Sequence, residues 1–183
     1  MTDIKKYKDV SKQMMKIIHS IDSSARIMGG MPRDLYFNKE INDIDIYSKI
    51  ENYKIILDNL DSKVTCHYIK DNVYNTDDGV VSTIDYLTIE GIEVNLIGIN
   101  IPPVEYIESF DCDICKFMYD AHEDKISIHF DINNLLKTKV ILLNPNLNEK
   151  QLVYARRHID KIRKKYPEFR VFLDNSLEAI ALL

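Results

Sequence analysis

The chain has 183 residues, of which 45% are hydrophobic and 29% charged, and its net charge at pH 7 is −5. This length suits one domain of ordinary size, and this composition excludes wholesale disorder. No apolar run reaches the roughly 18 residues that a membrane-spanning helix needs, and the charged N-terminus does not resemble a signal peptide. We therefore expect a folded protein without membrane association.

The net charge hides an uneven distribution along the chain. Between Lys150 and Arg170 there are eight lysine or arginine residues and two acidic residues, so that stretch carries a charge of +6. A uniformly acidic protein binds nucleic acid poorly, whereas a basic strip of this size can bind it locally. The three cysteines, Cys66, Cys112 and Cys115, form no disulfide framework and favour a reducing, cytoplasmic location.

The first third of the chain is predicted to alternate between helix and strand. Apolar residues recur at helical spacing over residues 4–21, which predicts an amphipathic helix. Residues 25–28 are predicted to form a short strand that leads directly into a glycine pair, and a short helix is expected over 33–37. Residues 41–47 alternate apolar and polar side chains, which is typical of a strand, and 51–60 have helical periodicity.

The remainder combines a strand hairpin with helical segments. Two strands are expected over residues 80–89 and 92–99, joined by a tight turn at Glu90-Gly91. A short helix is predicted over 104–108 and a short strand over 126–130. The last third is predicted to be helical, with one apolar stripe and the basic residues largely outside it.

Two acidic residues in the predicted strand 41–47 form the strongest candidate site. Asp43 and Asp45 are separated by one residue, so their side chains point to the same side of the strand, with Cα atoms about 6.6 Å apart. Ile44 and Ile46 then face a core. Two carboxylates on one face are unfavourable unless a cation neutralises them, and Mg²⁺ favours one or two carboxylates together with substrate phosphates. Two such ions can activate an attacking hydroxyl and stabilise a leaving pyrophosphate.

Upstream of these aspartates, Gly29-Gly30 joins a predicted strand to a predicted helix. Glycine has no Cβ, so a phosphate chain can approach the backbone closely, and a helix N-terminus offers free N–H groups. A glycine pair alone is a weak signal, and so is Asp-x-Asp. Their order and spacing together are much more specific.

These residues carry a resemblance to a known family. The run from Ile27 to Leu35 contains Gly29-Gly30-Met31-Pro32-Arg33-Asp34, and Asn42 to Ile46 contains Asp43-Ile44-Asp45. Together they resemble the head-domain signature of tRNA CCA-adding enzymes and bacterial poly(A) polymerases, which belong to the polymerase β-like nucleotidyltransferase superfamily. In that signature Gly-Gly-x-x-Arg-Asp precedes Asp-x-Asp by a short helix and loop. The strong resemblance covers residues 26–46, and a weaker one extends to about residue 120.

The resemblance implies a third carboxylate on a later strand. Glu93, between Ile92 and Val94, has the expected hydrophobic–acid–hydrophobic pattern, and Asp85 is a less favoured alternative. A fainter match covers residues 109–120, where the family motif opens Arg-Arg-Asp and ends Tyr-Asp. In this chain Ser109 and Phe110 replace the two arginines, which in the family help to handle the incoming nucleotide.

The fold class implied is α/β (α+β), a nucleotidyltransferase fold with a mixed sheet of about five strands flanked by helices. We expect a nucleotidyltransferase domain over residues 1–145. Residues 146–183 are expected to form a small C-terminal helical extension packed on it.

The function implied is transfer of a nucleotidyl group from an NTP to a hydroxyl, with release of pyrophosphate. Asp43, Asp45 and Glu93 would hold two Mg²⁺ ions, with Mn²⁺ as an alternative, and Gly29, Gly30, Arg33 and Asp34 would bind the nucleotide. The acceptor is expected to be an RNA 3′ end, for example that of a tRNA, a protein or a small molecule. The candidate acceptor-binding residues lie in the basic stretch: Arg156, Arg157, Lys161 and Lys164.

A second function class is a catalytically inactive member of the same fold that binds a nucleotide or a partner protein, as an antitoxin-like or regulatory module would. The replacement of both arginines favours this alternative. A basic helix is also more often a solvated outer face than a binding surface.

Each candidate residue also has an ordinary structural interpretation. The aspartate pair suits a solvated edge strand, the glycine pair suits a tight turn, Glu93 suits an exposed strand position, and Arg33-Asp34 suits an ion pair that packs a helix on the sheet. Cys112 and Cys115 have the spacing of half a zinc or redox motif. They lack a second pair and lie in an apolar segment, so no metal is expected there.

Overall fold

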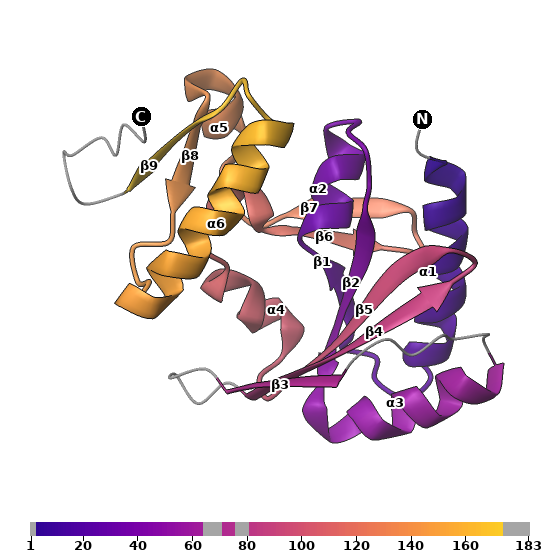
Figure 1. Cartoon of the computed structure of the whole chain (residues 1–183). Coiled ribbons are helices and arrows are strands. Elements are labelled where there is room, and N and C mark those ends of the chain that lie inside the picture. Colours follow the sequence, from indigo (N-terminus) through magenta and orange to yellow (C-terminus); the bar gives the residue numbers. More distant parts are fainter. Residues whose placement is uncertain (1–2, 64–70, 76–80, 174–183) are drawn as a thin grey trace.

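The computed structural model describes residues 3–63, 71–75 and 81–173, and it folds as helices packed around a twisted sheet (Figure 1). The helices are α1 (Ile4–Ile18), α2 (Gly30–Tyr36), α3 (Ile50–Lys63), α4 (Pro103–Tyr106), α5 (Ile132–Thr138) and α6 (Glu149–Lys165), with 3₁₀ turns η1 (Ile107–Ser109) and η2 (Asp113–Cys115). The strands are β1 (Arg26–Met28), β2 (Asp43–Lys49), β3 (Asp71–Asn75), β4 (Val81–Ile89), β5 (Ile92–Ile99), β6 (Phe117–Asp120), β7 (Lys125–Ile128), β8 (Val140–Leu143) and β9 (Arg170–Leu173).

The main sheet is mixed. Within the described ranges it has seven strands in the order β3-β4-β5-β2-β1-β6-β7. The central pair, β2 and β5, is parallel, and the other neighbours are antiparallel. A separate parallel pair joins β8 to β9. The predicted α+β class with a mixed sheet flanked by helices is therefore confirmed, with more strands than the five expected.

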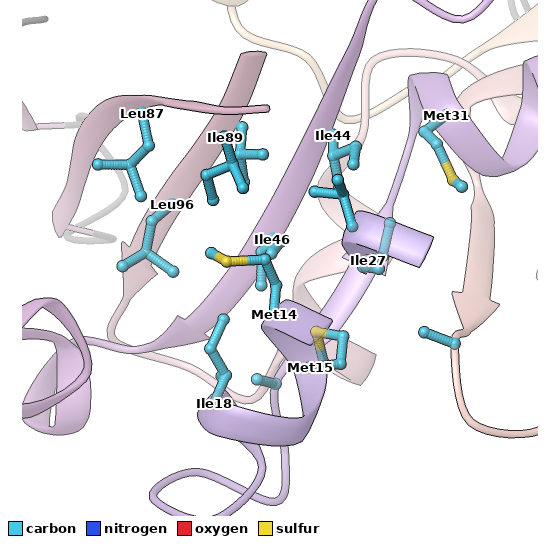
Figure 2. Close-up of a cluster of buried hydrophobic side chains, with 14 of the residues drawn as sticks. Met14, Met15, Ile18, Ile27, Met31, Ile44, Ile46, Leu87, Ile89 and Leu96 are labelled. Carbon is cyan, nitrogen blue, oxygen red and sulfur yellow. The ribbon is translucent and has the colours of Figure 1, made fainter. Parts of the chain in front are cut away.

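Helices α1 and α3 cover one face of this sheet (Figure 1). The α1 side chains Met14, Met15 and Ile18 pack on strand residues that include Ile27 and Ile46, and all five are almost fully buried (Figure 2). Each such side chain contributes about 1.5–3 kcal/mol to folding by leaving water. Because Ile44 and Ile46 point to this face, Asp43 and Asp45, which alternate with them, must point to the other.

A second core lies beside the first, where α6 packs on residues between Cys112 and Leu143. The α6 residues Ala155, Ile159 and Ile162 are buried there, which matches the predicted apolar stripe. Tyr166 and Phe117 are the largest fully buried side chains, and Phe37 stacks edge-on against both rings. Helix α6 is thus joined to the earlier chain by a continuous apolar core.

Most predicted elements appear with boundaries shifted by a few residues, and several others were missed. The Glu90-Gly91 hairpin is confirmed, and both turn residues have positive φ, 52° and 78°. The expectation of an entirely helical last third is wrong, because β8 and β9 flank α6. The expected strand at 126–130 is β7, whereas α5 and the short β3 had no counterpart in the prediction. The domain division at residues 145 and 146 stays a prediction.

In the part of the chain that the structure describes, every helix is too short or too polar to cross a membrane.

One glycine of β5 is required by close packing. A Cβ placed on Gly98 would lie 2.7 Å from Tyr53 Cδ2 and 2.9 Å from Thr83 Cγ2. Tyr53 cannot retreat easily, because its hydroxyl donates to the buried Asp85 carboxylate and lies 3.1 Å from the Leu96 carbonyl oxygen.

We therefore expect Gly98→Ala to destabilise the fold by about 1–3 kcal/mol, the usual cost of overpacking. Gly30→Ala is the matched control, because its nearest neighbour would be 3.8 Å away. Urea denaturation of both variants measures the difference. Equal stabilities would contradict the packing described for β4, β5 and α3.

Candidate active site

The polar face of β2 carries the aspartate pair. Burial alternates along the strand, with Ile44, Ile46 and Ser48 buried and Asp43, Asp45 and Tyr47 partly open. In the parallel pairing with β5, Asp43 lies opposite Glu93, and Asp45 lies opposite Asn95. Paired residues of neighbouring strands point to the same side of a sheet, so two adjacent strands contribute three carboxylates and one amide to one face.

The amide of Asn95 links the two aspartates. Its Nδ2 donates to Asp45 Oδ1 at 2.8 Å and to Asp43 Oδ2 at 3.4 Å. Asn95 is buried, and its Oδ1 is without a hydrogen-bond partner among the described residues. Sequence reasoning did not select Asn95. The signal that could have found it is its spacing of two from Glu93, which places both on one face of the strand.

Asp85 lies on the opposite face. Its carboxylate is buried under α3 and accepts a hydrogen bond from Tyr53. Glu93 is exposed at the start of β5, opposite Asp43. Of the two acids that the sequence offered as the third carboxylate, only Glu93 shares the face of Asp43 and Asp45.

The glycine pair adjoins the two aspartates. Gly29 has φ of +86°, a conformation that favours glycine, and a Cβ there would lie 3.9 Å from Asp45 Oδ2. A Cβ on Gly30 would lie 3.9 Å from Asp43 Oδ1. The turn at the start of α2 thus lies against both carboxylates, although 13 or more residues separate them in the sequence.

These residues form one wall of a cleft of about 780 Å³, a volume within the usual range for small-molecule sites. The opposite wall comes from α6 and from the segment between α4 and η2. The cleft is lined by Gly29, Gly30, Arg33, Asp34, Glu40, Asn42, Asp43, Asp45, Tyr47, Tyr106, Ser109, Phe110, Asp111, Cys115, His158, Lys161, Ile162, Lys164 and Lys165. Glu93 is not part of this described lining.

Burial and neighbouring like charges raise the pKa of both aspartates. Burial and then the neighbouring Asp43 raise the pKa of Asp45 to about 7, and the charge of Glu93 acts in the same direction. Burial and the charge of Asp34 raise the pKa of Asp43. The site is therefore short of positive charge, and a cation bound between the carboxylates would relieve the repulsion.

The donor set fits a hard divalent cation. Asp43 and Asp45 offer carboxylate oxygens beside a cleft that can admit phosphates, which is how Mg²⁺ is commonly held. Glu93 extends the same face by one more carboxylate. Burial and the neighbouring Asp43 disfavour the negative charge of Asp45, and a bound cation would stabilise that charge.

Arg33 and Asp34 form a buried network with the end of α6. Asp34 Oδ1 accepts from Arg33 Nε at 2.8 Å and from Tyr166 OH at 2.5 Å, and Asp34 Oδ2 accepts from Lys165 Nζ at 2.5 Å. Both side chains of the Arg33–Asp34 pair are more than nine-tenths buried. Desolvation disfavours the guanidinium, but the charges of Cys115 and Asp34 more than offset it and raise the pKa of Arg33. These contacts hold α6 against α2, and nucleotide binding by either residue stays a prediction.

Three aromatic side chains line the cleft beside Asp45. The ring centroids of Tyr47, Tyr106 and Phe110 lie 5.6–5.9 Å apart in each pairing. Phe110 also covers the glycine turn, since a Cβ on Gly29 would lie 3.6 Å from its Cε2. Phe110 and Ser109 occupy the positions where the resembled motif has two arginines. The cleft therefore has an aromatic surface at that place, with the three rings tilted or edge-on to one another.

The candidate acceptor-binding residues divide into two groups. Lys161 and Lys164 line the cleft together with Lys165, opposite the acidic wall. Arg156 and Arg157 are exposed on α6, outside the described lining. The basic stretch thus contributes ammonium groups to the cleft and guanidinium groups to the adjoining surface.

Solved structures share this architecture. A tRNA-processing enzyme in an apo form aligns with a TM-score of 0.62 and 19% identity over 91% of this chain and 44% of that chain. The Thermotoga maritima CCA-adding enzyme in complex with tRNA gives 0.61 and 15% over 90% of this chain and 38% of that one. A CCA-adding enzyme in complex with CTP gives 0.61 and 15%, with coverages of 91% and 39%.

These likenesses confirm the predicted resemblance to CCA-adding enzymes at the level of the fold. The chain spans less than half the length of each of these three chains. At the level of sequence, no family model and no curated protein matches.

We expect Asp45→Asn to stabilise the metal-free fold. The carboxylate has a higher pKa in the folded state than the ordinary 3.8, so its ionisation costs folding free energy. The cost is absent below about pH 4, grows as the pH rises toward 7, and is complete above it. The gain from the substitution should therefore be on the order of 2 kcal/mol at pH 8 and vanish near pH 4.

Denaturation in the presence of a chelator measures this gain. Asp9→Asn is the control, because the Asp9 side chain is 61% exposed. A loss of stability in Asp45→Asn at pH 8 would show that the carboxylate is a structural hydrogen-bond acceptor instead.

Proposed function

We propose that the chain is a metal-dependent nucleotidyltransferase that transfers a nucleotidyl group from an NTP to a hydroxyl acceptor and releases pyrophosphate. The observation that carries this proposal is one cleft with two opposed walls. Asp43 and Asp45 lie against the Gly29-Gly30 turn on one side, and Lys161, Lys164 and Lys165 line the other. A Mg²⁺–triphosphate complex needs both a carboxylate site for its cations and cationic partners for its phosphates.

The residues divide the work by position. Asp43 and Asp45 would hold two Mg²⁺ ions, and Glu93 would complete the ligand set at the outer end of the pair. Bound there, the metal supplies activation of the attacking hydroxyl and stabilisation of the leaving pyrophosphate. Asn95 fixes both aspartates through its Nδ2. Such preorganised charge, together with alignment of the reactants, accounts for most of the rate in phosphoryl-type transfers.

The phosphate chain would run between the glycine turn and α6. Without a Cβ, Gly30 leaves space within 4 Å of Asp43 and of the Arg33 guanidinium. Lys161 and Lys164 are exposed and can approach a polyanion, whereas Lys165 is held by Asp34. Arg33 is tied to Asp34 and Cys115, so it would act as a fixed positive charge at the base of the cleft.

The aromatic residues Tyr47, Tyr106 and Phe110 would receive a nucleobase. Stacking on aromatic side chains is worth about 1–3 kcal/mol per base and tolerates any base. Since Phe110 stands where the resembled motif has an arginine, we infer that this chain holds a base by stacking where the motif would use hydrogen bonds. An RNA 3′ end is the acceptor we favour, because solved neighbours include a CCA-adding enzyme in complex with tRNA.

The replacement of the motif's two arginines by Ser109 and Phe110 favours a second function, that of a nucleotide-binding or protein-interaction module without catalysis. A nucleotide-binding module would bind an NTP in the cleft without releasing pyrophosphate, whereas a protein-interaction module would be indifferent to NTPs. Turnover separates the two functions.

The test is incubation with each labelled NTP, Mg²⁺ and total RNA, with products resolved by size and pyrophosphate assayed. We expect label transfer with at least one NTP. Changing both Asp43 and Asp45 to Asn should lower the rate of transfer by more than roughly 10–100-fold, the loss caused by removing an outer-shell partner of a metal ligand. The Asp9→Asn variant serves as control. Mg²⁺-dependent thermal stabilisation by an NTP without pyrophosphate release would support a non-catalytic nucleotide-binding module. No stabilisation by any NTP would refute the transferase and favour the protein-interaction module.

The basic residues of α6 give a separate prediction for an RNA acceptor. Reversing Arg157, Lys161 and Lys164 to Glu should weaken RNA binding and reduce the slope of log affinity against log salt by about 2, since three phosphate contacts to a single strand are lost. A matched reversal of Lys5, Lys12 and Lys16, exposed on α1 across the sheet, should change neither. Filter binding between low and moderate salt measures both. Unchanged RNA affinity in the α6 triple variant would point to a small-molecule or protein acceptor.

A further inference from the structure

A polar cluster borders the cleft at η2, separate from the aspartate pair. Cys112 and Cys115 lie one 3₁₀ turn apart, and their Sγ atoms are 3.4 Å from each other. Cys112 is fully buried. Cys115 lines the cleft, although only 3% of its surface is exposed. The sequence shows the spacing of the two thiols, but not the groups that surround them.

Two cations face the Cys115 sulfur. Arg33 Nη1 donates to Cys115 Sγ at 3.6 Å, and His158 Nε2 lies 4.0 Å from the same sulfur. The other ring nitrogen of His158, Nδ1, donates to Asp111 Oδ2 at 2.7 Å. The Asp111 carboxylate thus orients the imidazole and stabilises its protonated form.

This arrangement distinguishes the two thiols. Hydrogen bonding from Cys112 lowers the pKa of the Cys115 thiol, and His158 and Arg33 act in the same direction. Hydrogen bonding to Cys115 and burial raise the pKa of the Cys112 thiol. Although desolvation opposes it, the hydrogen bond to Asp111 raises the pKa of His158. One cysteine is therefore held as a thiolate and the other as a thiol, which is the division found between an attacking and a resolving cysteine.

We propose that Cys112 and Cys115 form a redox-active dithiol, in which a small peroxide oxidises Cys115 at the wall of the cleft and Cys112 resolves the product to a disulfide. The narrow exposure of Cys115 selects a small oxidant over a bulky disulfide. The contact between the two sulfurs means that resolution requires only a small local movement.

The chemistry balances with hydrogen peroxide as the oxidant. The Cys115 thiolate attacks one peroxide oxygen, so that an S–O bond forms, the O–O bond breaks and hydroxide leaves. The Cys112 sulfur then attacks Cys115 Sγ. The S–S bond forms, the S–O bond breaks, and the departing hydroxide takes the Cys112 proton as water. Two electrons pass from the two sulfurs to the peroxide, which ends as one water and one hydroxide.

A metal site is the competing use of the same atoms, since Asp111, Cys112 and Cys115 place ligand atoms within 4.8 Å of one another. The charges argue against it. The Arg33 guanidinium contacts the Cys115 sulfur directly, and His158 is engaged by Asp111 through Nδ1. A metal cation would have to bind beside the charge of the Arg33 guanidinium. It would also have to displace the His158 proton that Asp111 accepts.

The experiment treats the intact chain with stoichiometric peroxide in a Cys66→Ser background, because Cys66 lies outside the described residues. We expect the intact mass to fall by two hydrogen atoms, with a Cys112–Cys115 disulfide found by peptide mapping and reversed by dithiothreitol. In Cys112→Ser, the reaction should stop at a sulfenic acid on Cys115 that dimedone traps. In Cys115→Ser, Cys112 should resist dimedone labelling, because it lacks thiolate character.

His158→Gln tests the cationic neighbours. At pH 7 the rate of oxidation should fall several-fold, since an unperturbed cysteine is only a few per cent ionised at that pH. His122→Gln, in the turn at the far end of the β6–β7 hairpin, should leave the rate unchanged. Circular dichroism confirms folding for each variant.

Three outcomes would overturn the proposal. They are irreversible over-oxidation of the wild-type pair without a disulfide, equal labelling of Cys112 and Cys115 in the two single variants, and stoichiometric zinc that survives a chelator and protects both thiols. The last would show a structural metal site. None of these readouts uses nucleotide turnover, so the proposal stands or falls separately from the function proposed above.

Discussion

The parallel pairing of β2 with β5 is the constraint on which the cleft depends. It sets Asp43 opposite Glu93 and Asp45 opposite Asn95, so that acidic side chains crowd one face of the sheet while Ile44 and Ile46 are buried on the other. A shift by one residue would bury the carboxylates and expose the isoleucines, so the core under α1 fixes the register. The hydrophobic burial that folds the protein thereby maintains the unfavourable charge cluster, and the pKa of Asp45 near 7 reflects its cost.

The second core supplies the opposite wall. Tyr166 and Lys165 at the end of α6 donate to Asp34 on α2, and Ile159 and Ile162 pack beside them in the second core. These contacts couple the position of α6 to the turn that begins at Gly29. The Arg33 guanidinium belongs to the same network and reaches Cys115, so the acidic site and the dithiol share one positively charged neighbour. A change of charge in the acidic site or in the dithiol would therefore change the electrostatic environment of Arg33.

The sequence predicted what short-range patterns encode. Alternation placed Asp43 and Asp45 on one face, and the glycine pair indicated the adjoining turn. The pattern of an acid between two apolar residues favoured Glu93 over Asp85 as the third carboxylate. The spacing of Asn95 from Glu93 gives their shared face, but the role of Asn95 follows from the register of two strands about 50 residues apart. The His158–Asp111 contact likewise spans 47 residues and has no short-range signal. The four-residue strands β8 and β9 were missed because they are too short to show a period, and pairing with each other is what stabilises them.

The central claim is that Asp43 and Asp45 form a cation site that opposes the lysines of α6. The most direct measurement is the titration of the Asp45 carboxyl carbon by NMR, without and with Mg²⁺. We expect a pKa near 7 for Asp45 without metal, and a clear lowering when Mg²⁺ is present, because the bound cation favours the carboxylate. An ordinary aspartate pKa close to 4 that Mg²⁺ leaves unchanged would contradict it.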